Sequence, residues 1–374
     1  MKFKSIILTV ILYCFYPFTF LSRVNKKRIT LISLEHDNLS KDFKLLYEQL
    51  SGMKQYELRT LLFKFEPNLL GNIRYGIACI RQLFIIQKSR LVIIDYNNFV
   101  ISKFAHRKQV KVLEIWHATG ALKQFGNYVK RDYEINNYDY VIANSDFYKH
   151  IYAKAFNVSE QNVLVTGIPN NDKIFDPHFF EATRQRLIAK YPILENKKVL
   201  TYAPTFRGRI STSFKEAKID LESVHRHLGE SYVIIYKVHP LISDSRYENN
   251  PNVIFIEDEF VSSIFCVTDI LITDYSAIAI DWMTFDKPII SYAPDLKKYA
   301  TKPGLTFDYK KEFPGPISVN EDELIAAIKI CADDRYRKKR EAFRQKTYKY
   351  LDGKSTDRVI SAIHSIMNDS LEIK

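Results

Sequence analysis

Short apolar runs alternate along this chain with longer stretches in which apolar residues recur at helical spacing. Continuous apolar runs of this kind are typical of strands that are buried on both faces of a parallel sheet. Helices between such strands indicate βαβ units and a doubly wound α/β fold. In the first half, the pattern predicts strands at 29–34, 91–95, 110–116, 140–143 and 163–166, and helices at 42–50, 72–86 and 147–156.

The alternation breaks at Gly167-Ile168-Pro169-Asn170-Asn171-Asp172 and then resumes, so we expect the link between two domains there. Two similar α/β halves that face each other would leave a cleft between the carboxyl ends of their strands, where such folds bind ligands. The second series predicts strands at 198–202, 232–237, 253–256, 270–273 and 289–292, and helices at 179–190, 262–267, 278–284, 321–332, 334–351 and 358–368.

The N-terminal segment from Ser5 to Leu21 is apolar and aromatic. No small-residue cleavage site follows it, which argues against a signal peptide. It is slightly shorter than the roughly 20 residues that a spanning helix needs, and it contains Pro17. Basic residues on both flanks favour a segment that lies in or is anchored at the cytoplasmic leaflet. A buried first helix of the domain is the alternative.

The amino-acid composition limits the classes of molecule that we expect this protein to bind. Of 374 residues, 46% are hydrophobic and 26% are charged, which is a globular balance with material for two domains. The net charge of +12 indicates phosphate-bearing partners: nucleic acid, an anionic membrane or a phosphorylated substrate. No nucleic-acid-binding motif accompanies the charge, so we expect no nucleic acid. The four cysteines lie far apart without metal or disulfide spacing, which is typical of a reducing cytoplasmic setting.

One predicted strand ends in a group of small polar residues. Thr273, Asp274 and Ser276 follow the apolar run 270–272, and a helical pattern begins at Ala277. Hydroxyls and backbone N–H groups at a helix N-terminus favour phosphate binding. Asp281 lies about one helical turn further on, where it could accept from a ligand hydroxyl or cap local structure.

A histidine follows a strand in each half. His117 comes directly after the run 112–115 and precedes a loop of small residues, and a histidine has the pKa of a general base near neutrality. His239 follows the strand at 232–236 together with Lys237, and the pair could bind a phosphate. The alternatives are a structural histidine in the first half and a capped strand end in the second.

The segment Thr201-Tyr202-Ala203-Pro204-Thr205-Phe206-Arg207 ends another strand. It offers backbone donors, a hydroxyl and a guanidinium that can bind phosphate with two parallel hydrogen bonds. A proline turn with a solvated arginine is the alternative. The sequence has no Asp-x-Asp pair, P-loop or GxGxxG motif, so we expect neither a metal nor a cofactor.

Together these motifs resemble the CDP-glycerol glycerophosphotransferase family, whose members build teichoic acid and related polyol-phosphate polymers. The stretch from His117 to Gly126 is similar to the primase branch, and Asn170 stands where the polymerases have an arginine. Ala277 replaces the second serine that is usual in the family. The matching segments cover about residues 110–360 in family order: Trp116-His117 with Lys123, Gly167-x-Pro169 with Asp172, 202–207, Lys237-x-His239-Pro240, 273–276 with Asp281 and Lys287-Pro288, and 352–355 with Arg358.

The resemblance implies a GT-B architecture of two Rossmann-like domains with an interdomain cleft. It implies a phosphotransferase of the EC 2.7.8 class that moves glycerol phosphate from CDP-glycerol to a lipid-linked (undecaprenyl diphosphate) saccharide in wall teichoic acid synthesis and releases CMP, acting as a primase. In this reading His117 is the general base and His239 binds the donor phosphates. The expected contacts to CDP-glycerol are Pro204, Thr205, Arg207, Lys237, Thr273, Asp274, Ser276 and Asp281.

The predicted organisation is a membrane-associating segment at 1–27, an N-terminal acceptor domain at 28–168, a CDP-glycerol-binding domain at 169–350 and a C-terminal helix at 351–374. We expect a peripheral protein on the cytoplasmic side of the cell membrane. The alternatives are a polymerising glycerol- or ribitol-phosphate transferase of the same family, a GT-B glycosyltransferase that uses a nucleotide sugar, and a non-catalytic membrane-bound scaffold.

Overall fold

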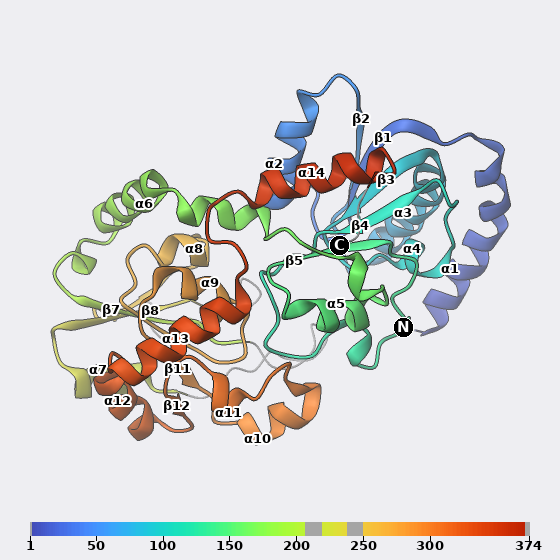
Figure 1. Cartoon of the computed structure of the whole chain (residues 1–374). Coiled ribbons are helices and arrows are strands. Elements are labelled where there is room, and N and C mark those ends of the chain that lie inside the picture. The colour runs from blue at the N-terminus through green and yellow to red at the C-terminus, as the bar shows by residue number, and fades with distance from the viewer. Residues whose placement is uncertain (1, 206–218, 238–249, 371–374) are drawn as a thin grey trace. The chain divides into compact units, whose positions relative to one another are not determined.

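The structure, a computed structural model, describes residues 2–205, 219–237 and 250–370 (Figure 1). The chain forms two compact units. The N-terminal unit consists of the chain up to Ala118, Phe125–Asp172 and the chain from Asp352 onward, and the C-terminal unit consists of Thr119–Gln124 and Lys173–Leu351. The predicted boundaries differ from this division in three ways: the N-terminal unit continues to Asp172, the short segment 119–124 joins the C-terminal unit, and the closing helix belongs to the N-terminal unit.

The N-terminal unit is built on a six-stranded parallel sheet with the order β2-β1-β3-β4-β5-β6. The predicted alternation of strands and helices is therefore confirmed for this half. The sequence pattern missed β2, an edge strand whose residues are half-buried or exposed. The strands are β1 (Asn25–Ser33), β2 (Glu57–Leu62), β3 (Ser89–Ile94), β4 (Lys111–Glu114), β5 (Tyr140–Ala143) and β6 (Val163–Val165).

Helices flank this sheet, and several begin at a residue whose side chain accepts a backbone N–H of the first turn. Ser40 does so for Phe43, and Asn68 does so for Gly71, which satisfies donors that the helix itself leaves unpaired. The helical elements are α1 (Lys2–Phe15), η1 (Tyr16–Leu21), α2 (Lys41–Ser51), α3 (Leu69–Lys88), α4 (Phe99–Lys103), η2 (Gly126–Tyr128), α5 (Tyr148–Phe156), η3 (Glu160–Asn162), η4 (Pro169–Phe175, which runs into the C-terminal unit) and α14 (Ser355–Met367).

The last helix, α14, is held in the N-terminal unit by two of the motif segments. The Asp172 carboxylate accepts the backbone N–H groups of Ser355 (2.8 Å) and Thr356 (2.7 Å) and the Thr356 hydroxyl (2.6 Å), and so caps the helix. Arg358 donates to the Thr166 carbonyl and forms a two-bond ion pair with Asp352. These residues, 166–172 and 352–358, form a latch that lets α14 lie against α2 in the same core (Figure 1).

The C-terminal unit has its own six-stranded parallel sheet, with the order β12-β11-β10-β7-β8-β9. The strands are β7 (Lys198–Tyr202), β8 (Tyr232–Tyr236), β9 (Val253–Phe255), β10 (Ile270–Thr273), β11 (Ile289–Tyr292) and β12 (Ile317–Ser318). The helical elements are α6 (Pro177–Lys190), η5 (Pro192–Leu194), α7 (Leu221–Leu228), α8 (Val261–Ile264), α9 (Ile278–Trp282), η6 (Met283–Phe285), α10 (Leu296–Tyr299), η7 (Ala300–Gly304), α11 (Tyr309–Glu312), α12 (Glu321–Ile330) and α13 (Asp334–Thr347).

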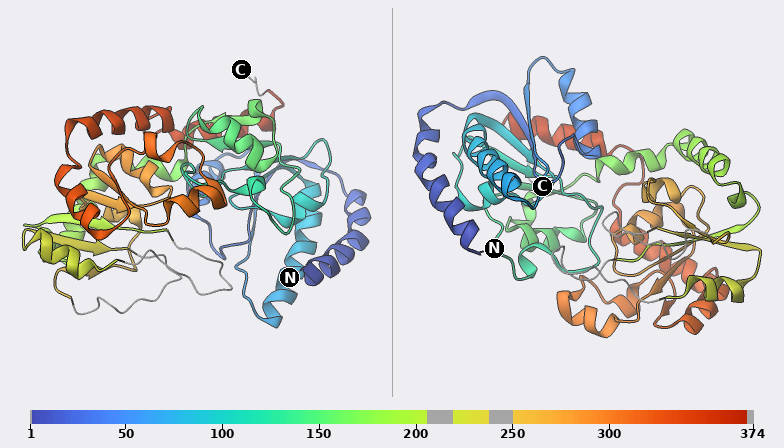
Figure 2. Two further views of the ribbon diagram at one scale, coloured as in Figure 1. Left: turned by 90° about the horizontal axis from the view of Figure 1, so that it is seen from below. Right: turned by 180° about the vertical axis from the view of Figure 1, so that it is seen from behind.

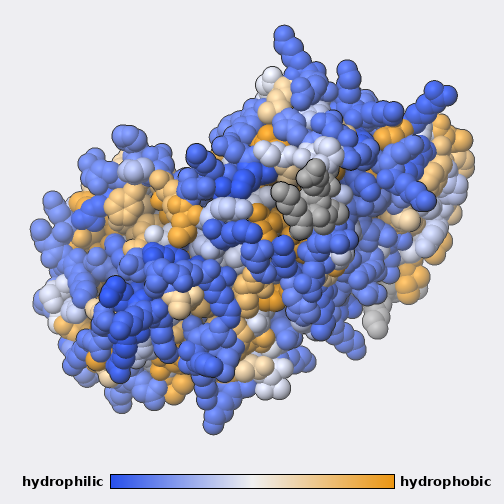
Figure 3. All heavy atoms as spheres, in the orientation of Figure 1, coloured by the Kyte–Doolittle hydropathy of each residue, from blue (hydrophilic) through white to orange (hydrophobic). Residues whose placement is uncertain are grey.

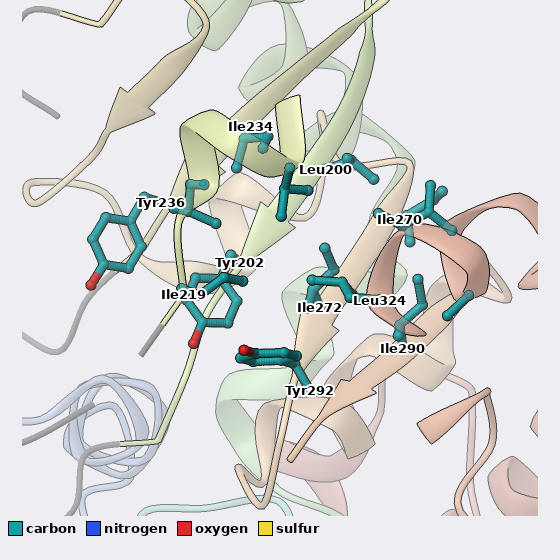
Figure 4. Packing of buried hydrophobic residues seen from close by; sticks show 14 of the residues in the cluster. Leu200, Tyr202, Ile219, Ile234, Tyr236, Ile270, Ile272, Ile290, Tyr292 and Leu324 are labelled. Carbon is teal, nitrogen blue, oxygen red and sulfur yellow. The ribbon is translucent and has the colours of Figure 1, made fainter. Parts of the chain in front are cut away.

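The strands of this second sheet bury both faces. Along β7, Leu200 points into the cluster shown in Figure 4, which also contains Ile272 of β10 and Leu324 of α12. Its neighbour Val199 belongs to the cluster on the opposite face, with Leu187 of α6. Successive side chains of a strand point to opposite faces, so the continuous apolar runs in the sequence are explained. The fold is α/β with two parallel sheets.

The apolar N-terminal segment forms α1 and η1 on the surface of the N-terminal unit, where both contact α3 (Figure 2). Leu12 is fully buried there, whereas Ile6, Val10 and Leu21 are 60%, 59% and 83% exposed. Among the described residues, α3 has the length and apolar composition of a membrane-crossing helix, but it connects β2 to β3 and buries one side. The segment from Ser5 to Leu21 is shorter than this, so its membrane association stays a prediction.

Candidate active site

His117 lies just beyond the carboxyl end of β4 in the N-terminal unit. Trp116, the residue before it, has a φ of +54°, a conformation that is costly for a bulky side chain. The Glu114 carboxylate accepts the Trp116 backbone N–H at 2.7 Å, and the indole packs on Phe125. With the indole held inside, His117 is exposed, and its ring stacks on Tyr96 at 4.2 Å and 12°. The turn presents the imidazole at the edge of the sheet.

Buried carboxyl groups lie beneath this edge. Burial raises the pKa of Glu114 well above its ordinary value, and the nearby Asp95 adds to the effect. Burial also raises the pKa of Asp95, at the carboxyl end of β3. Hydrogen bonds from the Ser33 and Ser40 hydroxyls offset only part of the rise in the pKa of Asp95. Such groups favour the neutral acid form, so this edge carries less negative charge than its carboxyl count suggests.

In the C-terminal unit, Thr273 and Asp274 connect the ends of β10 and β7. The Thr273 hydroxyl, which is fully buried, donates to the Ala203 carbonyl at 2.7 Å. The Asp274 carboxylate accepts the backbone N–H groups of Thr205 (2.9 Å) and Tyr275 (2.7 Å). The sequence prediction had both side chains contacting the donor. Their hydrogen bonds and burial show that they set the positions of the two loops, and their contact with the donor stays a prediction.

Residues 274–277 connect β10 to α9, and we refer to this turn as the elbow. The helix after the elbow is shorter than predicted. The pattern predicted a helix up to Thr284, but α9 spans five residues and continues as the 3-10 helix η6. Ser276, ahead of α9, is half-buried and accepts the Ile278 backbone N–H at 3.4 Å. The Ser276 hydroxyl therefore remains at the surface of the elbow, unlike that of Thr273.

Small-molecule sites are usually cavities of about 300–1,000 Å³, and the C-terminal unit has one at the lower end of this range, about 300 Å³, at the ends of β7, β8 and β10. It brings together Pro204, Lys237 and Ser276, three of the predicted donor contacts. The Lys237 ammonium donates to the Ile256 (3.0 Å) and Glu257 (2.7 Å) carbonyls, which uses two of its three donor positions. Burial lowers the pKa of Lys237. The remaining lining residues are Ala203, Glu257, Asp258, Glu259, Phe260, Val261 and Ile278.

Two of the three acidic residues that line this donor-side cavity form ion pairs with basic residues of α6. Asp258 accepts from Lys190 at 2.6 Å, and Glu259 pairs with Arg186. The hydrogen bonds from these partners lower the pKa of both carboxyl groups. The apolar part of the lining can pack a flat ring, and the ammonium and hydroxyl can bind oxygen atoms, so the cavity fits a phosphorylated compound that has a ring. The acidic residues were not predicted, because their order in the sequence gives no motif.

The loop that follows His117 is attached to the C-terminal unit. Asp281 accepts a hydrogen bond from the Thr119 hydroxyl. Lys123 forms an antiparallel bridge with Leu305, and Gln124 donates to the Gly304 carbonyl at 2.9 Å. For Asp281, the sequence left open a ligand contact or local capping; its observed partner is the Thr119 side chain, 162 residues away in the sequence.

Two predicted residues, Arg207 and His239, lie outside the described residues. Thr205 is buried, and Pro204 lies in the cavity wall. In the part of the chain that the structure describes, no group of three or more His, Cys, Asp or Glu side chains could hold a metal ion. The described geometry thus supplies an exposed histidine at the edge of one sheet and a cavity with polar and apolar lining residues at the edge of the other.

Comparison with known proteins assigns the chain to a family. The CDP-Glycerol:Poly(glycerophosphate) glycerophosphotransferase family matches residues 14–365. The chain is 28% identical over 399 residues to the teichoic acid glycerol-phosphate primase of Bacillus subtilis (strain 168), covering 98% of this chain and 100% of the primase. It is 28% identical over 362 residues to the teichoic acid poly(ribitol-phosphate) polymerase of Bacillus spizizenii, covering 91% of this chain but 56% of the polymerase.

Among solved structures, the chain is similar to the wall teichoic acid polymerase TagF soaked with CDPG. The TM-score is 0.73 and the sequence identity is 23%, and the match covers 99% of both chains. At this identity the likeness establishes the fold, which is GT-B-like. The family match extends over nearly the whole chain. The chain belongs to the CDP-Glycerol:Poly(glycerophosphate) glycerophosphotransferase family.

Proposed function

We propose that this protein transfers glycerol phosphate from CDP-glycerol to a hydroxyl of a lipid-linked saccharide in teichoic acid synthesis, adding the first unit as a primase. The observation that carries the proposal is the cavity of the C-terminal unit, which collects Pro204, Lys237 and Ser276 from three separate motifs. The match to a glycerol-phosphate primase over its whole length supports the primase assignment.

In the proposed reaction, His117 takes the proton from the acceptor hydroxyl. The oxygen then attacks the phosphorus that bears glycerol, a new phosphoester bond forms, and the bond to the bridging oxygen of the diphosphate breaks. CMP leaves with that oxygen and its electron pair. The exposure of His117 and its stacking on Tyr96 suit it to meet a large acceptor, and a positioned base contributes about 10²–10⁴-fold to the rate.

The donor side binds and stabilises charge. Lys237 and Ser276 would face the diphosphate, and Thr273 and Asp274 would hold the loops that present them. We assign His239 to the donor phosphates and Arg207 to their support on the motif resemblance. Donors that are already in place where negative charge grows are usually the largest single contribution to catalysis.

We further propose that the protein is peripheral on the cytoplasmic side of the cell membrane, with α1 and η1 as the contact. The exposed apolar residues of these helices lie beside the basic residues Arg23, Lys26 and Lys27. An apolar face next to positive charge is the pattern of a helix that lies in an anionic membrane surface.

The test is transfer of labelled glycerol phosphate by the purified full-length chain to a lipid-linked disaccharide, with CDP-glycerol, CDP-ribitol and nucleotide sugars offered separately. We expect CMP release in step with transfer from CDP-glycerol and a product one unit longer. A preference for CDP-ribitol would change the donor, long products would indicate a polymerase, and transfer of sugar would contradict the proposal.

A further inference from the structure

The N-terminal unit has a cavity of about 330 Å³ that the proposed reaction does not use. It lies between the carboxyl end of β2 and one side of α3, and we refer to it as the β2–α3 pocket. Most of its wall is apolar, and two arginines interrupt it. The lining residues are Leu61, Leu62, Phe63, Arg74, Ile77, Ala78 and Arg81.

The two arginines are positioned to bind an anion together. Arg74 and Arg81 are seven residues apart on α3, which is about two turns, so they lie on one side of the helix. Both are exposed, and neither guanidinium forms a hydrogen bond or ion pair with another described residue. By contrast, Arg28 and Arg59 near β2 both pair with Glu57. Unpaired guanidinium groups beside a cavity are suited to phosphate.

The pocket is continuous with an exposed apolar surface. Leu69, Leu70, Ile73 and Ile77, on the first half of α3, are 77%, 64%, 54% and 47% exposed, and Ile77 also lines the pocket. Helix α1 packs beside α3, and its exposed apolar residues extend this surface; Figure 3 shows hydrophobic residues along the rim where Figure 1 places α1. An apolar surface of this extent indicates a partner, here a lipid phase.

The pocket also lies at the same edge of the sheet as the predicted base. Its strand residues are at the carboxyl end of β2, and His117 follows the carboxyl end of β4. The sheet order β2-β1-β3-β4 puts three strand spacings between them, or about 14 Å at roughly 4.8 Å per spacing. A short saccharide joined to a diphosphate is an extended group that can bridge such a gap.

We propose that the β2–α3 pocket binds the diphosphate and the first isoprenoid units of the lipid-linked acceptor. Arg74 and Arg81 would hold the diphosphate, the apolar wall would hold the lipid chain, and the saccharide would extend along the sheet edge towards His117. Two unpaired arginines match the charge of a diphosphate better than that of the single phosphodiester of a bilayer phospholipid. This assignment rests on the proposed function for the identity of the acceptor.

The test compares two acceptors that share a disaccharide. One has an isoprenoid diphosphate, and the other has an uncharged alkyl chain. In Arg74→Ala/Arg81→Ala we expect KM for the diphosphate acceptor to rise at least tenfold, while KM for the alkyl acceptor, KM for CDP-glycerol and kcat stay within twofold. Arg81→Lys keeps the positive charge but loses the two parallel donors of the guanidinium. Its KM for the diphosphate acceptor should lie between those of the wild type and the double variant. The control Lys44→Ala/Lys103→Ala removes two exposed positive charges from the same unit and should match the wild type.

A binding experiment separates this proposal from the function on which it rests. Full-length protein is mixed with phosphatidylcholine vesicles that contain either an isoprenoid diphosphate without saccharide or phosphatidylglycerol at matched charge. We expect the arginine variant to lose binding to the diphosphate vesicles alone. Equal loss on both vesicles, equal rises in KM for both acceptors, or no change at all would overturn the pocket assignment. If the wild type transferred to no acceptor, the proposed function would fail, and the vesicles would still decide the pocket.

Discussion

The two units present their strand ends in different ways. At the edge of the N-terminal sheet, a strained turn exposes His117, and the carboxyl groups beneath it are buried and raised in pKa. At the edge of the C-terminal sheet, the side chains of Thr273 and Asp274 form hydrogen bonds between loops, and Lys237 donates hydrogen bonds to two carbonyls. The first edge suits a group that meets its substrate and moves a proton. The second suits a rigid cavity that binds and orients.

The largest effect is expected for the exposed base. His117→Ala should lower kcat by about 10²–10⁴-fold, the usual contribution of a positioned base, as measured by CMP release with saturating donor and acceptor. His178→Ala removes an imidazole that is exposed at the start of α6 and should behave as the wild type. Full turnover in His117→Ala would mean that the N-terminal edge does not supply the base.

Removing the helix cap at Asp172 should affect stability and leave the chemistry intact. Asp172→Ala deletes three hydrogen bonds at the start of α14, and we expect a loss of about 2 kcal/mol, near the upper end for helix caps. The change is measured as the denaturant midpoint of the transition that melts the N-terminal unit. The matched variant Asp176→Ala removes one capping bond, to His178 on α6, and should cost less. An equal loss in both would contradict the latch.

The donor edge should depend on pH through Lys237. Burial lowers the pKa of Lys237, so its positive charge is lost at a lower pH than the roughly 10.4 of a free lysine. Affinity for CDP-glycerol should therefore weaken as pH rises towards that value. Lys237→Met should weaken donor binding by about tenfold at neutral pH, or about 1.4 kcal/mol. In Lys237→Arg the alkaline weakening should vanish; its persistence would assign it to another group.

The pKa of the buried Glu114 is shifted in the opposite direction to that of Lys237, and the shift should appear in the stability of the fold. The folded state holds a proton on Glu114 that the unfolded chain, with an ordinary pKa of about 4.3, releases. Because the folded state then binds more protons, stability falls as pH rises above about 4. Glu114→Gln removes this dependence, so the unfolding midpoint of the variant should rise relative to that of the wild type as pH increases above about 4. The glutamine oxygen can still accept the Trp116 backbone N–H, so kcat of the variant should stay within about threefold of the wild type. A stability difference that does not change with pH would show that Glu114 is ionised in the folded state.

The smallest effect is expected at the elbow. Ser276 lines the cavity, and Ala277 next to it has no hydroxyl to replace it. Ser276→Ala should raise KM for CDP-glycerol by about threefold to tenfold, which corresponds to the loss of one hydrogen bond of ordinary strength. Restoring a serine at the next position, in Ser276→Ala/Ala277→Ser, should recover part of it. No change in KM would remove Ser276 from the donor contacts.

The sequence predicted the parts of the fold that depend on local pattern. Strands buried on both faces, such as β10 and β7, were found because their apolar runs are continuous, whereas the edge strand β2 lacks such a run and was missed. Short helices such as α4 and α11 were also missed, since they hold too few residues to show a period.

At the site, the sequence indicated which residues gather at strand ends. It could not distinguish side chains that line the cavity from side chains that are buried in hydrogen bonds between loops. Thr273 and Ser276 are three residues apart, yet one hydroxyl is fully buried and the other lies in a cavity wall. The capture of Thr119 by Asp281 and the role of Glu114 depend on tertiary contacts that leave no pattern along the chain.

The division of labour between the two edges can be tested by measuring the equilibrium binding of CDP-glycerol to the full-length His117→Ala protein by calorimetry. If the N-terminal edge supplies the base and the C-terminal cavity binds the donor, the variant will bind CDP-glycerol with the Kd of the wild type although it turns over at least a hundredfold more slowly. Loss of donor binding together with turnover would contradict the account, because His117 would then belong to the donor site.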